Sequence, residues 1–129
     1  MKNYTILVVE DERPLAEAIK AKLTKSGFEV VTARQVKQAL NYLEDKMKIS
    51  AIWLDHYLIG EENGLDFVAK IKNNEQWKKI PVFVVSNTAS AEKVKSYLRL
   101  GVNKYYTKAD FRLEDIISDI KEYLEHPKD

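Results

Sequence analysis

Short apolar runs alternate five times with longer amphipathic stretches along this chain of 129 residues. The runs are rich in Val, Ile and aromatic residues, and each is too short to be a helix. They cover residues 4–9, 28–33, 51–54, 82–85 and 104–107. This alternation predicts a parallel sheet with helices on both faces, because right-handed crossovers between parallel strands need the length of a helix. We therefore expect an α/β fold, with five parallel strands in a doubly wound sandwich.

The polarity of the runs indicates where each strand lies in the sheet. Runs 4–9 and 82–85 are predominantly apolar, as expected of central strands that are covered on both faces. Run 104–107 is more polar, which is typical of an edge strand.

The stretches between the runs carry the 3.6-residue spacing of helices with one apolar face. Two broad stripes share the spacing i, i+3, i+4, i+7 and i+11: Val36, Ala39, Leu40, Leu43 and Met47, and Leu113, Ile116, Ile117, Ile120 and Leu124. Narrower stripes are Leu15, Ile19 and Leu23; Leu65, Val68 and Ala69; and Ala91, Val94 and Leu98.

Helix-boundary signals agree with this assignment. Pro14 is suited to a first helical turn, and Asn63 with Asp66 forms a near capping box. Gly27 and Gly101 are typical C-terminal stops.

Composition and charge exclude several classes of protein. The length fits one domain, residues 1–129 with a core of about 4–125. Lys and Arg number 21 against 20 Asp and Glu, so the chain lacks the basic excess of a nucleic-acid binder. The absence of cysteine excludes disulfides, thiol nucleophiles and zinc–thiolate sites. The first apolar run is too short for a signal peptide or a membrane span, so we expect a cytoplasmic protein without membrane contact.

Polar residues follow four of the five runs. In an open α/β sheet, ligands bind outside the carboxyl ends of the strands, so these residues should meet at one edge. They are Glu10, Asp11 and Glu12 after the first run, Asp55 after the third, Ser86, Asn87 and Thr88 after the fourth, and Lys108 after the fifth.

This set of groups favours phosphoryl transfer. Clustered carboxylates repel one another unless a cation or a shared proton offsets them, and oxygen ligands without His or Cys suit Mg²⁺. A carboxylate such as Asp55 is a possible nucleophile toward phosphorus. Lys108 and Ser86 would neutralise and hydrogen-bond the remaining phosphoryl oxygens.

Five short motifs together carry a family resemblance. They are ILVVEDE at 6–12, IWLDHYL at 52–58, NGLDF at 63–67, VVSN at 84–87 and KYYTKAD at 104–110. In this order and spacing the chain resembles, over nearly its whole length, the receiver (CheY-like) domain of two-component response regulators. The resemblance implies the flavodoxin-like (βα)5 fold with strand order 2-1-3-4-5.

The resemblance also implies roles for the acidic residues. Asp55 corresponds to the phosphoacceptor of the family. Glu10 and Asp11 correspond to its acidic pair, with Asp11 as the more direct Mg²⁺ ligand. Asp55 and the main-chain carbonyl of Tyr57 would be further ligands.

Three more residues match family positions. Ser86 corresponds to the hydroxyl that bonds the phosphoryl group, and Lys108 to the lysine that pairs with it. Tyr105 corresponds to the aromatic switch that turns inward on activation. Tyr105 could instead be a static packing residue, with Tyr106 mobile or neither, since alternation sends the two rings to opposite faces.

The implied function is signalling rather than turnover. A sensor histidine kinase or phosphotransfer protein would donate the phosphoryl group to Asp55, and the domain would slowly hydrolyse its own acyl phosphate. Tyr57 and Thr88 resemble positions that tune that rate. The output surface for an unknown partner would include exposed aromatics, with Tyr97, Lys104 and Tyr105 on it, and the protein would be a monomer before phosphorylation.

Two other functions compete with this one. Phosphatases with an aspartyl nucleophile often place a second aspartate two residues later, where this chain has Tyr57. A degenerate receiver used only as a scaffold would not need Asp11, Asp55, Ser86 and Lys108 together. His56 is a tempting base beside Asp55, but we interpret it as a loop residue that points away, because neighbours at a strand end diverge.

The chain departs from the common family pattern at four places. Ile59 stands where proline is frequent, and the segment IGEENGL looks one residue longer than usual. Ala109 follows Lys108 in place of a cis proline, and a cis bond before a non-proline residue costs ~2.5–4 kcal/mol, so either a trans bond or a strained site is expected. Glu10 replaces the commoner aspartate, and its extra methylene would let it contact the ion through water.

Overall fold

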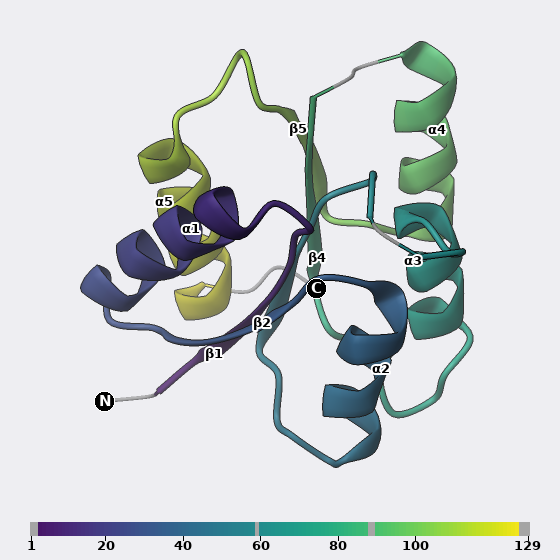
Figure 1. Cartoon of the computed structure of the whole chain (residues 1–129), viewed down its shortest axis with the longest axis horizontal. Coiled ribbons are helices and arrows are strands. Elements are labelled where there is room, and N and C mark those ends of the chain that lie inside the picture. The colour runs from purple at the N-terminus through teal and green to yellow at the C-terminus, as the bar shows by residue number, and fades with distance from the viewer. Residues whose placement is uncertain (1–2, 59, 88–89, 127–129) are drawn as a thin grey trace.

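Five parallel strands form one sheet, and five helices connect and cover them (Figure 1). The computed structural model describes residues 3–58, 60–87 and 90–126. The strands are β1 (Thr5–Val9), β2 (Glu29–Ala33), β3 (Ala51–Leu54), β4 (Val82–Ser86) and β5 (Lys104–Thr107), in the order β2-β1-β3-β4-β5. This order confirms the doubly wound, flavodoxin-like topology.

The helices lie on both faces of the sheet. They are α1 (Arg13–Lys25), α2 (Val36–Glu44), α3 (Gly64–Lys72), α4 (Ala91–Leu100) and α5 (Leu113–Glu125). Figure 1 shows α1 and α5 on one side, and α2, α3 and α4 on the other. Each side has its own apolar core: Ile19, Trp53 and Ile116 belong to the first, and Leu54 and Phe67 to the second.

The strand positions agree with the polarity of the runs. Every residue of β3 and β4 is buried, and β1 is buried beyond its first residue. By contrast β5, which pairs only with β4 at one edge, begins on the exposed residue Lys104. The more polar run is therefore the edge strand, as predicted.

Two of the predicted apolar stripes are wrong in part. Helix α2 ends at Glu44, and Met47 is exposed because the chain has turned at Lys46, whose φ is 64°. Leu98 of α4 is 51% exposed, whereas Tyr97 is fully buried. A hydropathy pattern favours the leucine, but the phenol ring of Tyr97 fills the larger space against the sheet and has a buried hydrogen-bond partner.

The helix-boundary signals are confirmed. Pro14 lies in the first turn of α1. Asn63 and Asp66 form a reciprocal capping box at the start of α3, at 2.9 and 3.1 Å. Gly101 ends α4 in the left-handed conformation, with φ 97°.

Candidate functional site

Backbone pairing holds the predicted site residues at one edge of the sheet. The amide of Glu10 donates to Ala33 of β2, and the amide of Asp55 donates to Val9 of β1, both at 2.9 Å. The amide of Lys108 donates to the carbonyl of Ser86 at 2.8 Å. Because each residue directly continues a paired strand, its side chain leaves the sheet at a fixed point.

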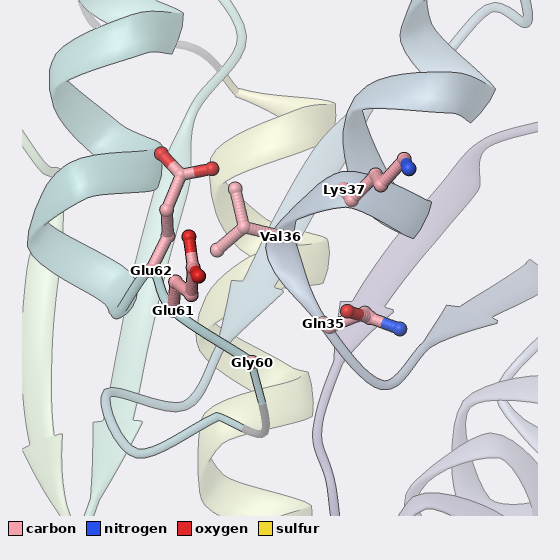
Figure 2. Close-up of a pocket in the computed structure, with 6 residues that line it drawn as sticks. All are labelled: Gln35, Val36, Lys37, Gly60, Glu61 and Glu62. Carbon is pink, nitrogen blue, oxygen red and sulfur yellow. The ribbon is translucent and has the colours of Figure 1, made fainter.

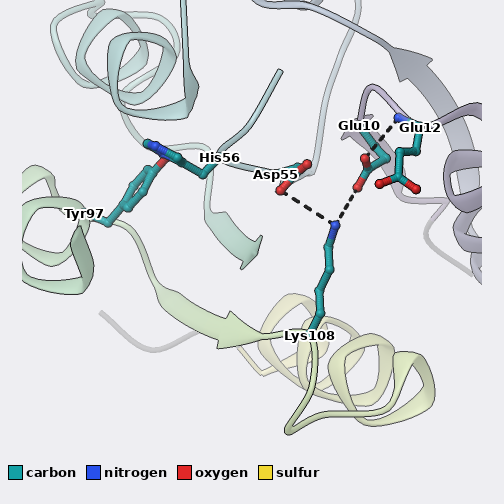
Figure 3. Close-up of polar contacts among 6 residues, drawn as sticks. All are labelled: Glu10, Glu12, Asp55, His56, Tyr97 and Lys108. Carbon is teal, nitrogen blue, oxygen red and sulfur yellow. Dashed lines mark hydrogen bonds and ion pairs between the residues drawn. The ribbon is translucent and has the colours of Figure 1, made fainter. Parts of the chain in front are cut away.

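Three carboxylates gather at this edge. One oxygen from each of Glu10, Asp11 and Asp55 lies within 4.8 Å of the others. Glu10 is 1% exposed and Asp55 4% exposed, while Asp11 is half-buried. The backbone N–H of Glu12 donates to Oε2 of Glu10 at 3.2 Å, which fixes that carboxylate (Figure 3).

Lys108 bridges two of the carboxylates (Figure 3). Its Nζ donates to Oε1 of Glu10 at 3.2 Å and lies 3.7 Å from Oδ1 of Asp55. The side chain is 18% exposed, so most of Lys108 is shielded from solvent where it meets the acids. The Lys108–Ala109 peptide bond is trans. Of the two alternatives expected from the missing proline, a trans bond or a strained site, the structure has the trans bond.

The buried acids have displaced pKa values. Burial, reinforced by the charge of Asp55, raises the pKa of Glu10 from 4.5 to about 7, against the opposing effects of the Glu12 amide and Lys108. Burial also raises the pKa of Asp55, and the Lys108 ammonium opposes that rise. One lysine therefore does not balance the acidic cluster, which favours a further cation at this edge.

Two buried oxygen atoms at this edge lack a hydrogen-bond partner within the described residues. They are Oδ1 of Asp55 and Oγ of Ser86, at the carboxyl ends of the adjacent strands β3 and β4. Buried polar atoms are normally paired, so unpaired ones in a native site call for a ligand or ordered water. The three carboxylates, which include that of Asp55, and the hydroxyl of Ser86 form the set of oxygen atoms that Mg²⁺ and a phosphoryl group would use.

The remaining predicted positions are less constrained by the structure. The side chain of Tyr57 is 50% exposed, and its hydroxyl accepts a short hydrogen bond from Nζ of Lys93 in α4. The main-chain carbonyl of Tyr57 as a metal ligand stays a prediction. Ile59 and Thr88 lie outside the described residues.

Sequence reasoning missed the burial of Tyr97. Tyr97 was expected on an exposed output surface, but it is 0% exposed, and its hydroxyl lies 2.6 Å from Nδ1 of His56. His56 does point away from Asp55, as predicted, yet it is buried against α4 rather than free in a loop (Figure 3). No sequence signal pairs these residues, because they are 41 positions apart.

The two tyrosines of β5 lie on opposite faces of the sheet. Tyr105 is half-buried and packs against Tyr97, with ring centroids 5.7 Å apart. Tyr106 is fully buried, and its hydroxyl donates to Oδ2 of Asp119 in α5 at 2.7 Å. Tyr105 therefore has the exposure that a mobile ring needs, and its role as the switch stays a prediction.

A separate cavity of about 260 Å³ lies beside the loops that follow β2 and β3 (Figure 2). It is lined by Gln35, Val36, Lys37, Gly60, Glu61 and Glu62. None of the predicted site residues lines it, so the chemistry of the acidic edge does not extend into it.

Among the described residues, no helix has the length and apolar character that a membrane-spanning segment needs.

Comparison with known proteins identifies the family. The family model of the response regulator receiver domain matches residues 6–121, and the chain belongs to this family. It is 29% identical to the phosphate regulon transcriptional regulatory protein PhoB of Pseudomonas aeruginosa, over 96% of this chain and 53% of that protein. It is 30% identical to the chemotaxis protein CheY1 of Helicobacter pylori, over 80% of this chain and 83% of that protein.

A solved structure gives the same result. The phosphorylated cyanobacterial phytochrome response regulator RcpA is 27% identical and superimposes with a TM-score of 0.82, covering 99% of this chain and 98% of that one. The chain spans about half the length of PhoB, so the activity of that whole protein does not transfer to it. What the comparisons share is the receiver domain of two-component systems.

Proposed function

We propose that the chain accepts a phosphoryl group on Asp55 from a histidine kinase or phosphotransfer protein in a Mg²⁺-dependent reaction. The observation that carries this proposal is the Lys108 ammonium between Glu10 and Asp55. Oδ1 of Asp55 is buried, has no hydrogen-bond partner among the described residues and lies 3.7 Å from Nζ. A nucleophile and a cation that can neutralise the transferred group thus share one edge of the sheet.

The residues at this edge fit a magnesium ion. Asp11 and Asp55 would bind it directly, with Glu10 and the main-chain carbonyl of Tyr57 completing the protein's contribution. The ion would supply charge neutralisation of the phosphoryl oxygens. Since three acids meet one lysine here, the cluster has a charge that a divalent cation would offset.

Three groups of the chain act on the transferred phosphoryl group. A carboxylate oxygen of Asp55 forms the new bond to phosphorus as the bond from phosphorus to the donor's imidazole nitrogen breaks, and the electron pair leaves with the imidazole. Lys108 neutralises charge on the phosphoryl oxygens, and the hydroxyl of Ser86 donates a hydrogen bond to one of them. Both groups are buried or nearly so, which strengthens their electrostatic effect.

The output would be a shift between two arrangements of the surface formed by α4, β5 and α5. Tyr105 is the switch residue in this proposal, and slow hydrolysis of the acyl phosphate resets the domain. In this proposal the protein is a cytoplasmic monomer that signals to another protein.

Phosphorylation is tested by intact-mass spectrometry after incubation with acetyl phosphate and Mg²⁺. We expect one added phosphoryl group on the wild-type chain and none on Asp55→Asn. Asp110→Asn, which changes an exposed aspartate in the loop after β5, is the matched control and should be labelled like wild type. Label retained on Asp55→Asn would show that the phosphoacceptor assignment is wrong.

The metal requirement is tested separately. Fluorescence of Trp53, which directly precedes Asp55 and is fully buried, should respond saturably to Mg²⁺. Asp11→Asn should weaken this response while leaving the folded state intact. An unchanged Mg²⁺ affinity in Asp11→Asn would remove this residue from the proposed ligand set.

A further inference from the structure

His56 and Tyr97 form a buried polar pair next to the phosphoacceptor. Nδ1 of His56 and the hydroxyl of Tyr97 are 2.6 Å apart, and their rings meet edge to face with centroids 5.6 Å apart. The two residues are 6% and 0% exposed. A hydrogen bond this deeply buried is costly to break, because each polar group would be left without water.

The main chain of His56 faces the reactive carboxylate. Hydrogen bonding from the backbone N–H of His56 is one of the influences that lower the pKa of Asp55. The side chain of His56 points the other way, toward α4 (Figure 3). One residue therefore contacts the phosphoacceptor with its backbone and Tyr97 with its imidazole.

Gly64 leaves the space that the pair needs. A Cβ at this position would overlap the Tyr97 hydroxyl and would lie 3.1 Å from Cα of His56 and 3.2 Å from the carbonyl oxygen of Asp55. The amide of Gly64 also donates to the carbonyl of His56 at 3.1 Å. His56 is thus held at two points: its carbonyl by the amide of Gly64, the first residue of α3, and its imidazole by Tyr97 of α4.

We propose that Tyr97 is a positioning residue for the phosphoacceptor: through its hydrogen bond to His56 it holds the main chain that follows Asp55. This inference rests on the proposed function, since it concerns the efficiency of phosphorylation at Asp55. The pair also connects the main chain beside Asp55 to α4, where the ring of Tyr97 packs against Tyr105.

Removal of the Tyr97 hydroxyl is the direct test. We measure the initial rate of phosphorylation by acetyl phosphate at saturating Mg²⁺ in wild type, Tyr97→Phe and Tyr106→Phe. Tyr106 is the matched control, because it is equally buried and its hydroxyl has one side-chain partner, on the opposite face of the sheet. We expect both variants to lose similar stability, but only Tyr97→Phe to react slower, by about fivefold, the effect of one lost hydrogen bond.

Variants of His56 separate positioning from packing. His56→Asn keeps a polar atom close to the place of Nδ1 and should restore most of the rate, whereas His56→Leu should match Tyr97→Phe. The double variant His56→Leu with Tyr97→Phe should be no slower than either single variant, because both remove the same bond. The backbone amide resonance of His56 should move in Tyr97→Phe and stay in place in Tyr106→Phe.

The outcomes distinguish this inference from the function on which it rests. Equal rates in wild type, Tyr97→Phe and Tyr106→Phe would overturn the positioning role and leave phosphorylation of Asp55 standing. If Tyr97→Phe does not fold, equal rates in His56→Asn and His56→Leu overturn it instead. A wild-type chain that takes up no phosphoryl group would overturn the proposed function, and the inference with it.

Discussion

The ammonium of Lys108 lies closer to Glu10 than to Asp55. Nζ is 3.2 Å from Oε1 of Glu10 and 3.7 Å from Oδ1 of Asp55, and only the contact with Glu10 is a hydrogen bond. In this state the lysine stabilises the ancillary acid more than the proposed nucleophile. Among the residues that the structure describes, Oδ1 of Asp55 thus has no hydrogen-bond donor, and the proposed nucleophile keeps an oxygen that is not engaged in hydrogen bonding there.

Replacement of Lys108 by methionine should impair phosphorylation much more than folding. Lys108→Met keeps an apolar stem but removes the cation, so the rate with acetyl phosphate should fall on the order of 10²-fold, as when one charge-stabilising group is removed. Intact-mass time courses measure this rate. Lys104→Met, at the start of β5, removes a half-exposed lysine that pairs with Asp119 and should change stability by only about 0.5 kcal/mol. A rate for Lys108→Met equal to that of Lys104→Met would contradict the assigned role.

Stability without divalent ions should fall as the pH rises from about 4.5 to about 7. Glu10 has its ordinary pKa of 4.5 in the unfolded chain and a pKa of about 7 in the folded one, so the folded protein binds the extra proton in this range. Raising the pH removes that proton at a cost to the native state. Urea denaturation at a series of pH values measures the effect.

The affinity for Mg²⁺ should rise with pH over the range in which stability without divalent ions falls. The ion competes with the proton on Glu10, so binding should strengthen with pH up to about 7 and then level off. Glu10→Gln should flatten this dependence and, at pH 8 without Mg²⁺, raise the free energy of unfolding by about 1–3 kcal/mol. Glu12→Gln changes an exposed neighbour and is the control. An unchanged pH profile in Glu10→Gln would exclude Glu10 as its source.

Tyr105 should become less reactive when the site is activated. Its ring is half-buried against Tyr97, and the proposed switch would turn it further inward. Nitration by tetranitromethane, read by peptide mass spectrometry, should slow at Tyr105 when beryllofluoride and Mg²⁺ are added. Tyr106 should stay unreactive in both states because it is fully buried. Equal nitration of Tyr105 with and without beryllofluoride would count against its role as the switch.

Gly64→Ala should lower the free energy of unfolding by about 1–3 kcal/mol, the usual cost of overpacking. The added methyl group would meet the Tyr97 hydroxyl and two backbone atoms. Thermal or urea denaturation measures the loss. Combining Gly64→Ala with Tyr97→Phe should cost less than the sum of the two, because one clash disappears. Additive losses would show that the alanine clashes with the backbone alone.

The fold was predictable because its signals are local. The runs at 51–54 and 104–107 coincide with β3 and β5, since short stretches rich in apolar or β-branched residues have few alternatives to a strand. Helix ends at Asn63 and Gly101 depend on residues within one turn. The apolar stripe did not place Tyr97 on the core face of α4, because a hydropathy pattern scores tyrosine as half polar. The burial of Tyr97 depends instead on His56, a partner far away in the sequence.

The composition of the candidate site was predictable for a different reason. Parallel strands end at a common edge, so a residue that follows a strand has a known place even before the structure is seen. Glu10, Asp55 and Lys108 meet there. Their protonation and the choice of Lys108 between the two acids were not predictable, because both depend on burial and on distances of a few tenths of an ångström.

The sheet divides the interior into two cores, and within the described part of the chain no buried side chain belongs to both. Trp53 belongs to the core under α1 and α5, and the next residue, Leu54, belongs to the core under α2, α3 and α4. Asp55 follows at the carboxyl edge of the sheet that separates the two cores. A substitution that repacks the core under α1 and α5 therefore need not disturb the core under α2, α3 and α4, provided that the charged edge of the sheet is unchanged.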